Sequence, residues 1–118
     1  MEFESLLNEI VEKTPGAQGA AIVAKDGLLV AKTAGEGIPF GDLAAHLSLP
    51  LLKSEDASRD LNIGVLREMV LFTEQYDIIV DNVSKGYFIM LIVDKNGFYG
   101  KGRWEVRRVR SHFRDELI

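Results

Sequence analysis

The chain has 118 residues, of which 47% are hydrophobic and 27% charged, and this composition predicts one folded domain and excludes a disordered chain. It contains no cysteine, which excludes disulfides, thiolate metal sites and a cysteine nucleophile. The net charge of −4 is uneven, because the residues from Lys101 onward carry +3 and the first hundred carry −7. The sequence has no leader-like start and no long apolar segment, so we expect a cytoplasmic protein without membrane insertion.

The first third of the chain predicts a helix followed by a β-hairpin. Phe3–Lys13 places its apolar residues on one side of a helix, which Thr14-Pro15-Gly16 ends. Gly19–Lys25 is a strand of small residues, and Asp26-Gly27 is a strong turn signal before a second strand, Leu28–Thr33. The small side chains predict that a helix packs closely against this hairpin.

The middle helix, Phe40–Ser58, is predicted to be apolar on two sides. One apolar stripe contains Phe40, Leu43, Ala44, Leu47 and Leu51. A second stripe, on roughly the opposite side, contains Ala45, Leu49 and Leu52, and a narrow polar strip contains Asp42, His46 and Lys53. In so small a domain only one side can face a sheet, so the second stripe needs another molecule to cover it. Pro50 lies within the helix and is expected to kink or split it.

Three strands and a last helix follow a connector at Asp60–Gly64. The strands are Glu68–Glu74, Tyr76–Val83 and Tyr87–Val93, and the tight turns between them imply an antiparallel meander. The last strand is a run of seven apolar residues, which predicts a central strand buried on both faces. A helix then runs from Gly100–Gly102 to about Glu116. The order α-β-β-α-β-β-β-α predicts a single α+β domain over residues 1–118, with a five-stranded antiparallel sheet between helices.

Residues that carry catalytic or metal chemistry are scarce. His46 and His112 fall on different helices and lack the spacing of a zinc site. The glycines at Gly35–Gly37 and Gly97–Gly102 lack the spacing of a phosphate loop, and there is no Gly-x-Ser-x-Gly elbow. We therefore expect no enzyme, no metal site and no cofactor.

Three short blocks resemble the roadblock (dynein light chain) family in their order and spacing. They are Pro15-Gly16-Ala17-x-Gly19-Ala20-Ala21 with Asp26-Gly27-Leu28, then Gly86-Tyr87-Phe88-x-Met90-Leu91-Ile92-Val93, then Gly100-x-Gly102-Arg103-Trp104-Glu105. The resemblance covers nearly the whole chain and implies the roadblock or profilin-like arrangement of the sheet and helices. It also implies a dimer in which the third strands pair across a two-fold axis and the second helices lie side by side.

The resemblance further implies a non-enzymatic scaffold or regulator of small Ras-like GTPases, one kind of which is a GTPase-activating partner in gliding motility. Together with the two-sided helix, it predicts a homodimer interface at Ala45, Leu49, Leu52, Met69 and Leu71. The predicted GTPase contacts are Glu36, Ile38, Asp42, His46 and Lys53. Three alternatives stay open: a small-ligand sensor, a dimerisation scaffold without a GTPase, and a nucleic-acid binder that uses Trp104 and the arginines of the last helix.

Overall fold

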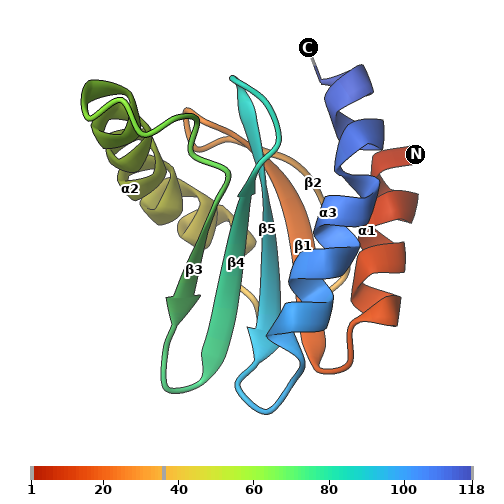
Figure 1. Ribbon diagram of the computed structural model, residues 1–118. Helices are drawn as coiled ribbons and strands as arrows, with labels where there is room; N and C mark the ends of the chain where they lie inside the picture. The colour runs from red at the N-terminus through yellow and green to blue at the C-terminus, as the bar shows by residue number, and fades with distance from the viewer. Residues whose placement is uncertain (1, 36, 118) are drawn as a thin grey trace.

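The computed structural model describes residues 2–35 and 37–117, arranged as three layers (Figure 1). In chain order the elements are α1 (Glu2–Lys13), β1 (Ala17–Ala24), β2 (Leu29–Lys32), α2 (Phe40–Asp60), β3 (Glu68–Phe72), β4 (Tyr76–Asn82), β5 (Tyr87–Asp94) and α3 (Tyr99–Glu116). Helices α1 and α3 lie side by side on one face of the sheet, and α2 covers the other. The predicted α+β class and element order are confirmed.

The five strands form one antiparallel sheet in the order β2-β1-β5-β4-β3. The strand β5 is central, as its apolar sequence predicts. The two edges differ, because β2 has four residues and an irregular register against β1, with a shift between Ile22 and Val23. By contrast, β3 pairs regularly with β4 from Glu68 opposite Asp81 to Phe72 opposite Asp77, and has no neighbouring strand on its other side among the described residues.

The central strand β5 supplies side chains to two cores in alternation. Ile89, Leu91 and Val93 face α1 and α3, where they pack with residues such as Leu7 and Phe113. The intervening side chains face α2, and this second core contains Phe88, Met90 and Ile92 with Phe40, Ala44, Leu47 and Leu51. A strand with alternating neighbours on both faces has no polar position, which explains the unbroken apolar run.

The corner where α1 enters β1 touches the loop between β5 and α3. Gly16 has a φ of +88°, and a Cβ built there would lie 2.5 Å from the Cα of Gly97. Only glycine combines this positive φ with so close an approach of two backbones. The contact fixes the ends of β1 and β5 to each other, as the backbone hydrogen bond from the Asp94 N–H to the Gly16 carbonyl also does.

Of the two outcomes predicted for Pro50, a kink or a split of the helix, the structure of α2 excludes the split. The helix is continuous from Phe40 to Asp60, so the predicted split does not occur. Proline removes one N–H donor, which leaves the carbonyl four residues earlier without its usual partner. That carbonyl belongs to His46, which is exposed, so water can satisfy it. The buried Leu47 and Leu51 hold both halves of the helix to the sheet.

Candidate protein-interaction surface

Helix α2 is anchored to the sheet along one side and open on the others. Its second apolar stripe stays uncovered, with Leu49 57% and Leu52 39% exposed, and Ala45 is exposed as well. The prediction that one protomer does not bury this stripe is confirmed. Near the C-terminal end of α2, the Glu55 carboxylate accepts hydrogen bonds from the buried Lys25 Nζ at 2.7 Å and from the Asn82 Nδ2 at 2.8 Å. These bonds fix the rotation of α2 about its own axis.

This rotation turns the leucine stripe toward the β1–β2 turn. A Cβ built at Gly27 in that turn would lie 3.4 Å from the Cα of Ala45, and the neighbouring Leu28 is 68% exposed. We call Ala45, Leu49, Leu52 and Leu28 the leucine face. It lies toward the β2 side of the sheet, because the β1–β2 turn belongs to that edge.

Met69 and Leu71 lie on the other edge strand, β3, where they are half-buried against the second core. The five residues predicted to form one dimer interface therefore belong to two separate surfaces of the protomer. Sequence reasoning passed over the side of α2 that points toward β3. Helical residues rotate by roughly 100° each, so Leu43, Pro50 and Ala57 lie opposite Ala45 and Leu52. The seven-residue spacing of these three residues indicates that they share one side of the helix. Leu43 packs into the same core as Met69 and Leu71.

The predicted GTPase contacts fall into three groups. Asp42, His46 and Lys53 are exposed on the outer side of α2, away from the sheet and beside Leu49. Ile38 is half-buried and packs against the second core, so much of its side chain is turned inward. Glu36 lies outside the described residues.

The arginines of α3 are largely paired with acids of the same chain. The Arg110 Nε donates to Asp81 at 2.8 Å, the Arg103 Nε donates to Glu68 at 2.6 Å, and Arg108 reaches both Glu9 and Glu105. The +3 of the C-terminal segment is thus balanced by neighbouring carboxylates. This pairing weakens the nucleic-acid alternative, which needs free cations to replace counterions along a phosphate backbone.

The two buried carboxyl groups among these, Asp81 and Glu105, have shifted pKa values. Burial raises the pKa of Asp81, which is fully buried, and the Arg110 guanidinium offsets only part of this effect. Burial also acts to raise the pKa of Glu105, but the hydrogen bonds from Lys101 and Arg108 outweigh it, and the pKa is lowered. Both carboxylates stabilise the packing of α3 and neither lies in a cleft with a second catalytic group, so they are structural.

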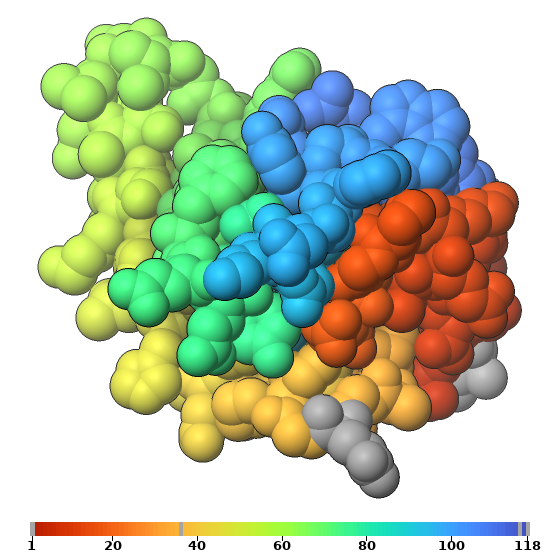
Figure 2. All heavy atoms as spheres, turned by 90° about the horizontal axis from the view of Figure 1, so that it is seen from below, coloured from red at the N-terminus to blue at the C-terminus, as the bar shows by residue number. Residues whose placement is uncertain are grey.

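Exposed aromatic side chains gather around the start of α3, at the lower end of the molecule. Phe72 at the end of β3 meets Tyr99 edge-to-face, with ring centroids 5.0 Å apart, and both rings are partly exposed. Seen from below in Figure 2, the turn after β3 and the residues before α3 meet in the middle of the surface. Trp104 lies on α3 itself, where the Lys101 Nζ sits 4.7 Å from its ring centroid.

Within residues 2–35 and 37–117 no group of three or more histidine, aspartate or glutamate side chains is placed to hold a metal ion. None of the three helices, over the part of the chain that the structure describes, is long and apolar enough to cross a bilayer.

Comparison with known proteins decides the family. The sequence model of the Roadblock/LC7 domain family matches residues 3–94, which is most of the chain. The chain belongs to the Roadblock/LC7 family. No curated protein matches the sequence.

Solved structures share the fold of this Roadblock domain at low sequence identity. A Roadblock/LC7 domain from Streptomyces avermitilis has a TM-score of 0.86 at 16% identity, covering 97% of this chain and 96% of its own. The gliding protein MglB from Thermus thermophilus has a TM-score of 0.83 at 19% identity, covering 94% and 84%. A profilin from Acanthamoeba castellanii has a TM-score of 0.68 at 14% identity, covering 98% of each chain. At these identities the likeness establishes the fold alone.

Proposed function

We propose that this Roadblock domain is a non-catalytic, homodimeric module that binds a small Ras-like GTPase and regulates it. The observation that carries the proposal is the uncovered leucine face of α2, next to the polar strip of Asp42, His46 and Lys53. An exposed apolar centre with a charged rim is the usual composition of a protein-binding surface. The family resemblance supplies the class of partner, and the likeness to a gliding protein agrees with it.

The proposed dimer uses the other side of the molecule. Among the described residues no strand pairs with the outer edge of β3, so a second copy of β3 can satisfy the backbone groups there. Met69 and Leu71 are only half-buried in one protomer. Leu43, Pro50 and Ala57 of α2 face the same side, so paired α2 helices cover them. This assignment keeps Leu49 and Leu52 free for the GTPase in both protomers.

The mechanism is a shift in population and not a chemical step by this chain. A GTPase switch segment alternates between conformations, and a surface that contacts only the hydrolysis-competent one increases its population. The structure offers no arginine on the outer face of α2 between Phe40 and Ser58, and Arg59 is held by Asp56 at 2.6 Å. Stabilisation of the switch segment therefore fits this surface better than an arginine finger does.

A binding experiment with matched variants tests the proposal. Small Ras-like GTPases from the source organism, loaded with GDP or a GTP analogue, are titrated calorimetrically with the purified protein. We expect binding that depends on the bound nucleotide and is lost in Leu49→Asp. Phe98→Asp is the control, because Phe98 is 62% exposed but lies before α3, on the opposite layer. Absence of binding by either nucleotide form, or equal loss in both variants, contradicts the proposal.

A further inference from the structure

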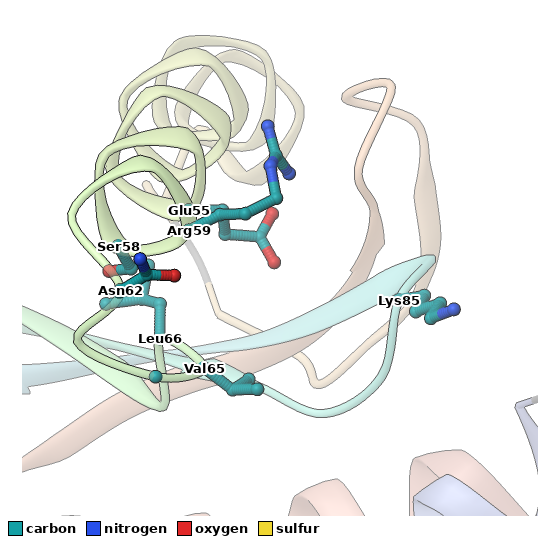
Figure 3. Close-up of a pocket in the computed structure, with 8 residues that line it drawn as sticks. Glu55, Ser58, Arg59, Asn62, Val65, Leu66 and Lys85 are labelled. Atoms are coloured by element: carbon teal, nitrogen blue, oxygen red, sulfur yellow. The ribbon is translucent and has the colours of Figure 1, made fainter.

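A cavity of about 590 Å³ lies between the C-terminal end of α2 and the β4–β5 turn. Its walls include Glu55 and Arg59 from α2, Val65 and Leu66 from the segment before β3, and Lys85 from the turn. Figure 3 shows Glu55 and Arg59 projecting from α2 toward the side on which Lys85 lies, with Val65 and Leu66 below the helix. A volume of this size suits a small organic molecule, since ligand pockets span roughly 300–1,000 Å³.

A second, smaller cavity of about 230 Å³ adjoins the first. The two share Glu55, Val65 and Lys85, and the smaller one extends to Asn82, Ser84 and Arg114. We call the combined space the α2-end cavity. It borders the sheet at the end of β4, so its inner wall is part of the rigid core of the domain.

Two polar atoms on this inner wall lack partners. The Asn82 Nδ2 donates to the Glu55 Oε2 and to the Leu66 carbonyl, both at 2.8 Å, which fixes the orientation of the amide. The Asn82 Oδ1 is shielded from solvent and accepts no hydrogen bond from any described residue, and the same holds for the Ser84 Oγ. Polar atoms left unsatisfied in this way are costly. Because both oxygens lie beneath the cavity surface, a small rotation of either side chain is needed to bring its oxygen within reach of a hydrogen-bond donor on a ligand.

The charge of the α2-end cavity favours an anion. The Lys25 ammonium, 2.7 Å from the Glu55 carboxylate, offsets the negative charge on the inner wall. Lys85 and Arg114 also line this space, and neither is within ion-pair distance of a carboxylate among the described side chains. Arg114 donates to the Val83 carbonyl at 3.0 Å. Lys85 and Arg114 therefore add two cations to a lining whose apolar side chains include Val65 and Leu66.

We propose that the α2-end cavity is a binding site for a small organic anion. The ligand carries a carboxylate or a phosphate monoester that meets Lys85 and Arg114, and an apolar body that rests on Val65 and Leu66. After such a rotation of Asn82 or Ser84, an N–H or O–H group of the ligand donates to the Asn82 Oδ1 or the Ser84 Oγ. The site is separate from the leucine face, so this inference does not depend on the proposed binding of a GTPase.

Titrations followed by amide chemical shifts test the site with defined probes. The probes are 4-hydroxybenzoate and 4-hydroxyphenyl phosphate, with the neutral 4-hydroxybenzyl alcohol and inorganic phosphate as comparisons. We expect saturable shifts at Leu66, Ser84 and Lys85 with at least one aromatic anion, and affinities about tenfold weaker for both comparison probes. The tighter of the two aromatic anions identifies the acid group that the site prefers. Failure of both anions to saturate, or equal affinity for the neutral alcohol, overturns the proposal.

A pair of lysine variants locates the binding. Lys85→Gln removes a cation from the cavity, whereas Lys53→Gln removes one from the outer side of α2; both lysines are exposed, so both variants should fold. We expect Lys85→Gln to weaken binding of the aromatic anion about tenfold and Lys53→Gln to leave it unchanged. Equal effects of the two substitutions, or no effect of Lys85→Gln, show that the anion binds elsewhere and overturn the proposal.

Discussion

The buried ion pair between Asp81 and Arg110 predicts a large and pH-dependent loss of stability in Arg110→Leu. Asp81 is 0% exposed and the Arg110 side chain 16%, so removal of the guanidinium leaves a carboxylate in the core without its charged partner. Removing one member of a buried pair costs about 3–5 kcal/mol, and the partial exposure of Arg110 places this case near about 3 kcal/mol. In a domain of this size the loss lowers Tm by roughly 10 °C.

The pH dependence follows from the raised pKa of Asp81. Burial favours the protonated carboxyl in the folded state, so this group contributes stability below its unfolded pKa and loses it as the pH rises through its folded pKa. Without Arg110 the folded pKa rises further. The difference in unfolding free energy between the wild type and Arg110→Leu should therefore be largest near pH 7 and shrink toward about pH 5.

Urea unfolding followed by circular dichroism measures these differences at both pH values. The double variant Asp81→Leu/Arg110→Leu is the control, because a buried pair replaced by two apolar side chains often leaves stability unchanged or higher. We expect the double variant to be more stable than Arg110→Leu. A loss below about 1 kcal/mol in Arg110→Leu, with no dependence on pH, would refute the view that Asp81 is held as a charged partner.

Three further predictions concern the α1–β1 corner, α3 and the β3 edge. Gly16→Ala should destabilise the domain by more than about 1 kcal/mol in urea unfolding, because φ is +88° and a Cβ would meet Gly97, whereas Gly86→Ala, with open space around it, should be nearly neutral. Glu105→Gln should lower the stability of the domain at neutral pH and make its stability less dependent on pH in acid, as measured by thermal melts. The reason is that the pKa of Glu105 is lowered in the folded state, so its carboxylate contributes stability above the unfolded pKa, and this stability is lost as the pH falls through the folded pKa. Leu71→Lys should shift the sedimentation coefficient from dimer to monomer while Leu71→Met keeps the dimer, and a monomeric wild type would contradict the proposed interface.

The sequence predicted those features that depend on local pattern. Tyr87–Val93 is central because both of its faces are apolar, and Leu49 and Leu52 are exposed because Phe40, Ala44 and Leu47 already occupy the sheet-facing side. Such periodicity shows which residues share a side of a helix. It does not show how the helix is rotated about its axis relative to the edges of the sheet.

The features that sequence reasoning missed depend on distant partners. The rotation of α2 about its own axis is set by the ion pair between Glu55 and Lys25, which lie 30 residues apart along the chain. The pairing of Arg110 with Asp81 likewise joins residues 29 positions apart, so the basic character of the last helix could not be judged from that helix alone. The α2-end cavity has no sequence motif, because its walls come from four segments that only the fold brings together.

The unequal edges of the sheet limit how far it can grow. Two copies joined along β3 leave only their β2 strands at the outer margins, and these strands are four residues long with an irregular register. Short, irregular margins are poor templates for a further strand. Assembly by this route therefore stops at a closed pair. A molecule with two long, regular edge strands would instead add further copies and form a filament.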